Sequence, residues 1–270
     1  MQSRLHTTTQ IDALGANNYV LHLEGAFEGV RPGQFVMLSL PTGWPVQLPR
    51  PFSYFDIQES WASFFLKVLG PGTQALVEAG VGAEIKVTGP LGSGFPQPQD
   101  IPGNESAVRE PVCIAGGVGL APFLLWCRER QAEGRAPVPM LYGGATAEAV
   151  VGHDYFEEAA QSFHLSTDDG SLGFHGNVLD LYRCLARDGL IDGQAPVYCC
   201  GPDAMMQAVA RDCAERAVPC YVSLETYMAC GYGVCNGCSV EVKGEGRFAG
   251  KRYVKTCCEG PVFASTELAR

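Results

Sequence analysis

The sequence changes its pattern at one place, the polar and proline-rich stretch PQPQDIPGNESAVRE at 96–110. Before it, short runs alternate apolar and polar residues between Gly and Pro, which is typical of a small antiparallel barrel or sandwich. After it, apolar runs alternate with helical patterns, which favours a parallel, doubly wound α/β sheet. Two such patterns need two cores, so we predict a domain boundary within this stretch.

Three units follow from this division. The first strands are expected at 19–25, 33–40, 51–57, 63–69 and 83–89, and the later ones at 111–117, 137–144, 162–170, 195–201 and 218–225, with a helix at 120–134. The last fifty residues are rich in Gly and Cys, with one short strand expected at 238–244, and they indicate a small lobe organised by a ligand. We therefore predict domains at 1–104, 105–222 and 223–270.

Composition excludes several classes of protein. The sequence has 270 residues, and it shows neither a basic and apolar leader nor an apolar run of about 18 residues, so we expect a soluble, cytoplasmic protein without a membrane span. A net charge of −10 with 19 Lys and Arg gives no basic stripe, which argues against nucleic acid as a partner. The 12 cysteines are not expected to form a disulfide framework, because thiols are kept reduced in the cytoplasm.

Three cysteines stand close together in MACGYGVCNGC, at Cys230, Cys235 and Cys238. With a later cysteine they match the C-x4-C-x2-C…C spacing of plant-type [2Fe–2S] ligation. A zinc site is less favoured, because zinc sites more often use two C-x2-C pairs and no second pair is present. The spacing alone leaves the fourth ligand open between Cys257 and Cys258.

A glycine-rich turn, AGGVGLAPF at 115–123, follows an apolar strand and opens a helix. Glycines at such a turn let backbone N–H groups approach a pyrophosphate, although the same turn also occurs for structural reasons alone. It is not the G-x-G-x-x-G fingerprint, because Pro122 stands at the third glycine. Two more loops, YGG at 142–144 and CGPDAMM at 200–206, also follow predicted parallel strands, and three such loops at one sheet edge favour a dinucleotide.

Five segments then occur in the order found in the ferredoxin–NAD(P) reductase superfamily, which this chain resembles over nearly its whole length. They are RPFSYF at 50–55, LKVLGPGT at 66–73, GPLGSGF at 89–95, AGGVGLAPF and CGPDAMM. The resemblance implies an N-terminal FAD-binding barrel, an NAD-binding α/β domain and a C-terminal [2Fe–2S] lobe. A guanidinium fork suits phosphate oxygens, and a small hydroxyl can contact the flavin without blocking the nicotinamide.

The resemblance also implies residue roles. Arg50 pairs with the FAD pyrophosphate, unless it is only a strand-end surface residue, and Ser53 lies near the flavin N5. Some branches place a tyrosine between these two residues, where this chain has Pro51 and Phe52, so the aromatic that stacks on the flavin is open. The implied set is completed, for FAD, by Phe65, Leu66, Lys67, Gly72 and Thr73 and, for NAD, by Gly116, Gly117, Gly119, Cys200, Gly201 and Pro202.

The C-terminal segments resemble one branch of this superfamily more closely. KTCCEGPVF at 255–263 and SLETYMACG at 223–231 are similar to the electron-transfer subunits of NAD-dependent, class 1B dihydroorotate dehydrogenases. That resemblance makes Cys257 the fourth ligand and Cys258 a bystander. It implies an FMN-containing catalytic partner subunit, in a hetero-oligomer, that oxidises dihydroorotate in pyrimidine biosynthesis, with electrons passing singly through the cluster to FAD and then as hydride to NAD⁺.

Two other interpretations remain at this stage. In the first, the same three units form the reductase subunit of a hydrogenase, a sulfite reductase or an oxygenase. In the second, the chain is a zinc-binding interaction module with a vestigial reductase fold, and its glycine loops are purely structural. NAD is preferred over NADP because no cluster of Arg or Lys stands near the expected ribose, although Arg183 and Arg187 could approach it in space. Asp168 and Asp169, at a predicted strand end, either contact that ribose or form a solvated turn.

Overall fold

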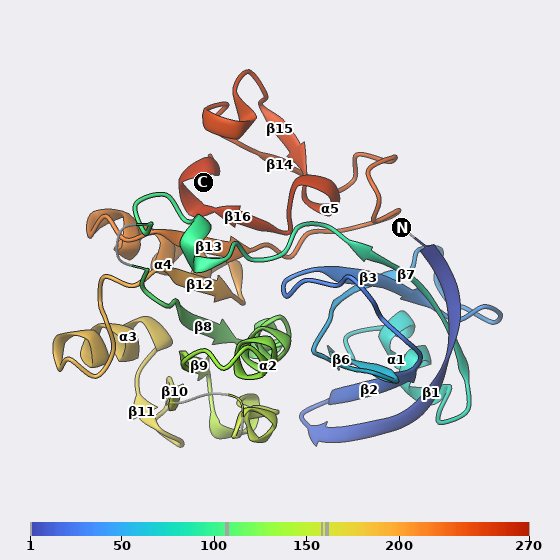
Figure 1. Cartoon of the computed structure of the whole chain (residues 1–270). Helices are drawn as coiled ribbons and strands as arrows, with labels where there is room; N and C mark the ends of the chain where they lie inside the picture. The colour runs from blue at the N-terminus through green and yellow to red at the C-terminus, as the bar shows by residue number, and fades with distance from the viewer. Residues whose placement is uncertain (1, 106–107, 158, 160–161, 270) are drawn as a thin grey trace.

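The computed structural model describes residues 2–105, 108–157, 159 and 162–269, so Ser106 and Ala107 of the predicted boundary stretch lie outside the described residues. Two seven-stranded sheets stand side by side, and the C-terminal residues lie across both of them (Figure 1). One sheet is antiparallel and curls into a half-barrel, and the other is mostly parallel. The predicted fold class is confirmed.

The half-barrel has the strand order β4-β3-β7-β1-β2-β6-β5. Its elements are β1 (Gln2–Gly15), β2 (Asn18–Glu24), β3 (Phe35–Ser39), β4 (Arg50–Ser53), β5 (Asp56–Gln58), β6 (Trp61–Lys67), α1 (Pro71–Glu78) and β7 (Glu84–Leu91). Inward-facing residues of these strands form one apolar core, which includes Leu21, Val36, Tyr54 and Phe64.

Strand β1 is absent from the sequence-based expectation. It pairs with β2 along its second half and with β7 along its first half, so it is the central strand that joins the two halves of the sheet. Most of its residues are exposed. A mostly exposed strand has no need of the apolar alternation by which strands are recognised, and this explains why the pattern did not indicate it.

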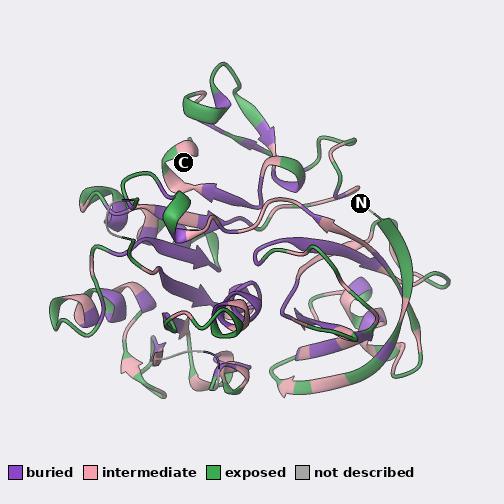
Figure 2. Cartoon of the chain, in the orientation of Figure 1, coloured by how far each residue is buried: buried purple, intermediate pink, exposed green. Residues whose placement is uncertain are grey.

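The second sheet has the order β11-β10-β9-β8-β12-β13-β16. Its neighbouring strands all run parallel, except that β16 runs antiparallel to β13. Its strands are β8 (Val112–Gly116), β9 (Pro139–Gly144), β10 (Ser162–Thr167), β11 (Phe174–His175), β12 (Val197–Cys200), β13 (Cys220–Ser223) and β16 (Val262–Ala264). Strand β8 is buried along its whole length, as Figure 2 shows for the centre of the sheet. The order reverses between β8 and β12, which is where ligands of such sheets bind.

Helices cover both faces of this sheet. Helix α2 (Phe123–Ala132) packs in one core, and α3 (Val178–Arg187) and α4 (Asp203–Glu215) pack in the other. The predicted helix at 120–134 is therefore confirmed, although a 3₁₀ turn at Gly117–Leu120 precedes it and Pro122 is its N-cap. The other 3₁₀ turns are Pro98–Asp100, Ala147–Ala149, His153–Phe156, Gly246–Phe248 and Ser265–Glu267.

The C-terminal residues form a small lobe and then return to the second sheet. The lobe contains β14 (Ser239–Glu241), β15 (Tyr253–Lys255) and α5 (Thr256–Glu259). Its last strand, β16, pairs antiparallel with β13, and the N–H of Leu224 donates to the carbonyl of Pro261 at 2.9 Å. The N–H of Ser93 in the half-barrel donates to the carbonyl of Gly260 at 2.6 Å, so the same turn contacts both larger units.

A polar and aromatic seam joins the half-barrel to the second sheet. The Tyr155 hydroxyl donates to Asp12 Oδ2 at 2.7 Å, and this carboxylate also contacts His22 at 2.9 Å. Phe55 packs edge-on against Tyr155, with ring centroids 5.3 Å apart. This seam fixes the space between the two units.

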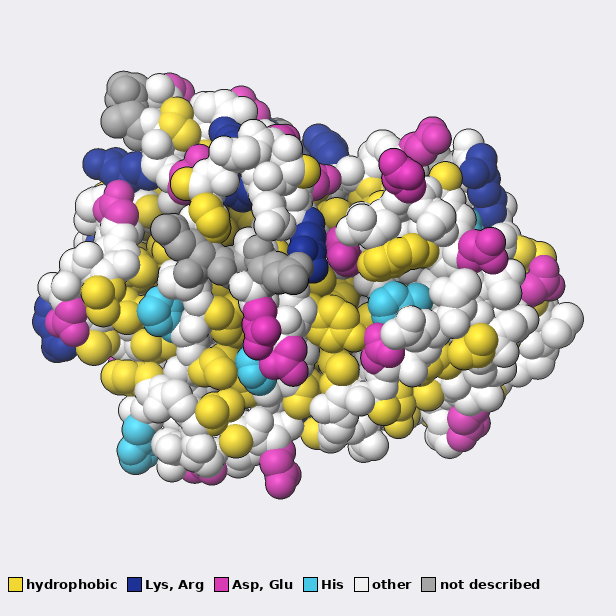
Figure 3. Space-filling view, turned by 60° about the horizontal axis from the view of Figure 1, so that its bottom comes forward, with side chains coloured by type: hydrophobic (Ala, Val, Ile, Leu, Met, Phe, Trp, Pro, Cys, Tyr) yellow, Lys and Arg dark blue, Asp and Glu magenta, His cyan; other side chains and the backbone are white. Residues whose placement is uncertain are grey.

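On the face drawn in Figure 3, Lys and Arg side chains are scattered and do not form a stripe. No helix among the described residues is long and apolar enough to cross a membrane.

The pKa of Glu129 on α2 gives a test of how this helix packs against the rest of the chain. Burial and the like charge of Glu133 raise the pKa of Glu129 from 4.5 to about 7. Between these values the folded state binds more protons than the unfolded state, so the free energy of unfolding falls as the pH rises. We expect Glu129→Gln to raise the free energy of unfolding by roughly 1–2 kcal/mol above pH 7 and by much less at pH 4.5, measured by urea unfolding.

Glu59→Gln is the matched control, because Glu59 is an exposed acid in the turn after β5. Its effect on the free energy of unfolding should be small at both pH values. An effect of Glu129→Gln that does not change with pH would contradict the assignment of the shifted pKa to Glu129.

Candidate functional site

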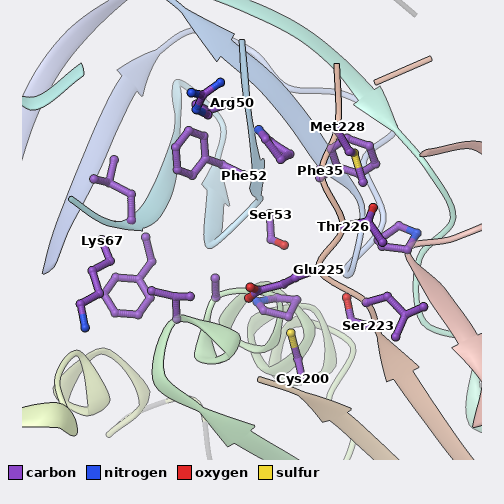
Figure 4. Close-up of a pocket in the computed structure, with 18 of the residues that line it drawn as sticks. Phe35, Arg50, Phe52, Ser53, Lys67, Cys200, Ser223, Glu225, Thr226 and Met228 are labelled. Atoms are coloured by element: carbon purple, nitrogen blue, oxygen red, sulfur yellow. The ribbon is translucent and has the colours of Figure 1, made fainter. Parts of the chain in front are cut away.

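A cavity of about 260 Å³ lies between the half-barrel and the carboxyl ends of β12 and β13 (Figure 4). Nine of the residues predicted to bind cofactors line it: Arg50, Pro51, Phe52, Ser53, Phe65, Leu66, Lys67, Thr73 and Cys200. The lining is completed by Phe35, Leu69, Val118, Ala121, Pro122, Ser223, Leu224, Glu225, Thr226, Met228 and Pro261. The cavity is mostly apolar with a few polar groups, as is usual for cofactor sites.

Arg50 is held at the half-barrel side of this cavity. Its Nη1 donates to the carbonyl of Leu48 at 2.9 Å, and a Cβ on Gly72 would lie 3.4 Å from its Nε. Gly72 therefore lets the start of α1 approach the guanidinium closely. The Thr73 hydroxyl accepts from the N–H of Leu69 at 3.0 Å and so fixes the loop before that helix. A guanidinium beside a helix N-terminus is a fitting environment for phosphate oxygens.

Aromatic side chains surround the middle of the cavity. Phe52 is half-buried, whereas Phe65 and Phe35 are buried, and all three line the cavity. Figure 4 places Phe52 between Arg50 and Ser53. Lys67 is exposed and lies on the opposite side of the cavity from Thr226 and Met228. A planar ring inserted here would meet apolar faces on more than one side.

Ser53, Cys200 and Glu225 direct their polar ends into the same space (Figure 4). Burial raises the pKa of the Cys200 thiol, and the nearby Glu225 carboxylate adds to this effect. Glu225 remains open to solvent on one side, but the surrounding protein desolvates its carboxylate enough to raise the pKa. Both shifts favour the uncharged form of the side chain.

Glu225, Thr226 and Met228 were not among the predicted site residues. The sequence singled out SLETYMACG only as a point of resemblance, because these residues follow a strand without any motif of their own. The Thr226 hydroxyl is buried and has no hydrogen-bond partner among the described residues. Since a buried hydroxyl without a partner costs free energy, it indicates a group to be bound in the cavity.

The predicted NAD-binding glycines lie behind this lining. A Cβ on Gly119 would collide with the carbonyl of Cys200, and one on Gly116 would lie 3.0 Å from Cδ of Pro202. Gly201 has a φ of +155° and packs against Gly116. The packing of β8 against β12 requires these glycines in any case, so their role in binding NAD stays a prediction. Gly117 differs, because it has a φ of +54° and open space beside it.

The residues considered for ribose recognition occupy separate positions. Asp168 follows β10, and its N–H donates to the carbonyl of Gly144 at 3.1 Å. Asp169 accepts from the hydroxyl of Ser171 at 2.6 Å, within a turn. Arg183 pairs with Asp212 at 2.7 Å and Arg187 with Asp188 at 2.9 Å. Acids therefore pair with both arginines, which lowers the positive charge that either one offers to a 2′-phosphate.

The predicted cluster ligands lie in two pairs. The Cys230 thiol hydrogen-bonds with Cys235. Cys238 is buried next to Cys257, whose N–H donates to Cys238 Sγ at 3.4 Å. Cys258 is exposed, and its Sγ lies 3.7 Å from that of Cys257. Within the described ranges, no group of three or more His, Cys, Asp or Glu side chains could hold a metal ion as they stand. Ligation by all four predicted cysteines therefore requires the two pairs to approach each other.

The chemistry of the cysteine loop nevertheless fits a cluster. Burial of the Cys230 thiol opposes ionisation, but the N–H groups of Cys235, Tyr232 and Val234 outweigh it and lower the pKa to about 6. N–H groups directed at sulfur also stabilise the thiolates of a bound cluster. Gly231 has a φ of +82°, and a Cβ there would lie 2.5 Å from Met37 Cγ, so this glycine lets the loop lie directly on β3.

Phe35 and Met228 connect the cavity with the cysteine loop. Both line the cavity, and both pack in a small apolar cluster that also contains Cys238 and Cys257. Figure 4 shows Phe35 and Met228 side by side at one end of the cavity. The cavity and the buried cysteine pair are therefore separated by one layer of side chains.

Known proteins share both the sequence and the fold of this chain. Residues 225–269 match the iron-sulfur cluster binding domain of dihydroorotate dehydrogenase B, and residues 113–211 match the oxidoreductase NAD-binding domain. The electron transfer subunit of dihydroorotate dehydrogenase B (NAD(+)) from Clostridium acetobutylicum is 37% identical over 93% of this chain and 90% of its own length. The same subunit of Enterococcus faecalis is 34% identical over 93% of this chain and 92% of its own.

Solved structures agree with this relationship. The structure of an NADH-dependent reduced ferredoxin–NADP oxidoreductase that performs flavin-based electron bifurcation matches with a TM-score of 0.81 at 25% identity, over 98% of this chain and 89% of that one. The ferredoxin reductase in carbazole 1,9a-dioxygenase matches in fold with a TM-score of 0.65, over 81% of this chain and 67% of that one. The chain is an oxidoreductase subunit, and it belongs to the family of dihydroorotate dehydrogenase B (NAD(+)) electron transfer subunits.

Proposed function

We propose that this chain transfers electrons between a catalytic dihydroorotate dehydrogenase subunit and NAD⁺, with FAD in the cavity and a [2Fe–2S] cluster on Cys230, Cys235, Cys238 and Cys257. The observation that carries this proposal is the position of Phe35 and Met228, which contact both the cavity and the buried cysteine pair. A flavin and a cluster bound at these places would be neighbours. The three units, divided near residues 104 and 222, would then carry FAD, NAD and the cluster, with the FAD cavity also taking residues from the second and third units.

The cofactors supply the redox chemistry, and the chain holds them in place. When bound, the flavin exchanges hydride with the nicotinamide and single electrons with the cluster. Arg50 would hold the pyrophosphate of FAD, and the start of α1 would add N–H groups to it. Ser53 would position the flavin edge, with Glu225 and Cys200 beside the nicotinamide. The loop at Gly117 and Gly119, next to Cys200, Gly201 and Pro202, would admit NAD.

The partner we propose is an FMN-containing catalytic subunit in a cytoplasmic hetero-oligomer. Three large apolar side chains on the segment around the cysteines are exposed: Tyr227 at 96%, Val234 at 74% and Tyr232 at 46%. Apolar groups gathered on a surface commonly mark a protein interface. They surround the residues through which electrons would enter, so docking there would bring the partner closest to the cluster.

The first test is anaerobic purification followed by iron, sulfide, zinc and flavin analysis. We expect about two irons, two sulfides and one FAD per chain, with a visible spectrum that bleaches on addition of NADH. Zinc without flavin would contradict the proposal and favour an interaction module. A protein that contains FAD and the cluster, but that does not exchange electrons with a dihydroorotate dehydrogenase catalytic subunit, would favour a reductase of another complex.

The two adjacent cysteines of α5 give a second test. Cys257 is buried against Cys238, whereas Cys258 is exposed, so we expect Cys257→Ser to lose most of the iron and sulfide. Cys258→Ser is the matched control and should retain both, with an unchanged spectrum and FAD content. Loss of the cluster in Cys258→Ser alone would assign the fourth ligand to Cys258.

The docking surface gives a third test. We expect Val234→Ser to weaken binding to the catalytic subunit by about tenfold, because it removes an exposed apolar side chain from the centre of the interface. Leu190→Ser is the control, since Leu190 is also an exposed apolar residue, at 67%, but lies in the turn after α3 in the α/β unit and not near the cysteines. Binding is measured by titration with fluorescently labelled catalytic subunit, with FAD and iron content checked in both variants. Equal affinities of the two variants would place the interface elsewhere.

A further inference from the structure

A second cavity lies beside the start of β1 in the half-barrel. It shares no lining residue with the cavity at Arg50, Ser53 and Cys200, which is called the flavin cavity below. Its volume is about 420 Å³. The pairing of β1 with β7 sets Gln2 opposite Gly89 and Arg4 opposite Val87, and all four residues line the cavity. The segment after β2 closes it with Phe27, Glu28 and Val30. In Figure 1 this is the region where the start of β1 lies beside β7.

The hydroxyl of a buried tyrosine, Tyr54, reaches this cavity. Tyr54 is 1% exposed, and its ring packs in the half-barrel core against Phe64 and Phe27. Its hydroxyl is the end that reaches the cavity wall, because a Cβ on Gly89 would lie 3.3 Å from that oxygen. The described residues offer this hydroxyl no hydrogen-bond partner. Burial raises the pKa of Tyr54, so the hydroxyl stays protonated and available as a donor.

The oxygen of the Tyr54 hydroxyl is not fully buried, because it reaches the open space of the cavity. A hydroxyl that faces a cavity and makes no hydrogen bond to the described residues is available as a donor to water or to a ligand. Phenylalanine at position 54 would fill the same core space but would leave the cavity without this donor. The adjacent Ser53 faces the flavin cavity, so neighbouring side chains on this segment serve two separate cavities.

The charged and ring groups around the hydroxyl define the ligand. The Arg4 guanidinium makes no ion pair with any described residue, and this exposed side chain brings a positive charge to the cavity wall. The His6 ring contacts the carbonyl of Glu24 through Nδ1 at 2.8 Å and stacks on Phe27, with ring centroids 4.5 Å apart. Glu28 is an exposed residue of the lining, and its negative charge opposes a doubly charged phosphate more strongly than a singly charged carboxylate.

We propose that this cavity binds a small organic carboxylate, whose oxygens accept from the Tyr54 hydroxyl and the Arg4 guanidinium while its apolar body rests on Phe27 and Val30. A carboxylate offers two acceptor oxygens in one plane, which suits a guanidinium together with one hydroxyl donor. The site does not depend on the FAD, NAD or cluster sites.

Benzoate is the probe, because it joins a carboxylate to an apolar ring, and benzamide is its uncharged counterpart. Saturation-transfer NMR on the FAD-loaded chain should show benzoate binding with a Kd of about 1 mM and much weaker binding of benzamide. Tyr54→Phe and Arg4→Gln should each weaken benzoate binding by about tenfold. The flavin spectrum should not change on addition of benzoate, which separates this site from the flavin cavity.

Stability measurements keep the test independent of folding. Tyr54→Phe keeps the ring and removes a hydroxyl that makes no hydrogen bond to the described residues, so the melting temperature without ligand should change little. Arg4 is exposed, so its replacement should not affect folding. The proposal is overturned if benzoate fails to bind at about 10 mM, if both variants bind it as the wild type does, or if benzamide binds equally well.

Discussion

The antiparallel pairing of β16 with β13 is the interaction on which the arrangement of the sites depends. The chain leaves β13 at the edge of the flavin cavity, forms the cysteine loop and the small lobe, and then returns beside the same strand. Because both ends of this long excursion are tied to one strand, the cysteine loop cannot move far from the cavity. The contact of Ser93 with Gly260 adds the half-barrel to the same junction. One short strand therefore fixes three units relative to one another.

This junction also explains why the cavity is built from segments far apart in the sequence. Arg50 and Ser53 come from the half-barrel, Cys200 from the end of β12, and Glu225 from the segment after β13. The seam at Asp12, His22 and Tyr155 holds the opposite side of the two larger units together. A planar cofactor between them would be held by surfaces that are already rigid, which lowers the entropic cost of binding it.

Much of the fold and of the candidate site could be predicted from the sequence because their signals are local. The central parallel strands β8, β9 and β12 are continuous apolar runs, and the cysteine spacing and the RPFS segment each lie within a few residues. The remainder depended on long-range pairing. Strand β1 is mostly exposed and carries no apolar alternation, β16 was assigned to the small lobe although it completes the second sheet, and Glu225 acquires its environment only from Ser53 and Cys200, which are distant in sequence.

The glycines show why a motif can be predicted correctly and its purpose remain a separate question. Gly116 and Gly119 allow the turn after β8 to lie against the loop at Cys200, where a Cβ would collide with Met205 or with the backbone of Cys200. That packing is required to place the Cys200 thiol in the cavity opposite Ser53. Whether or not these two glycines contact a dinucleotide, they set the distance between the sheet edge and the half-barrel side of the cavity. Gly117 is free of such packing, so it is its backbone φ of +54°, and not a neighbouring side chain, that favours glycine at this place in the turn.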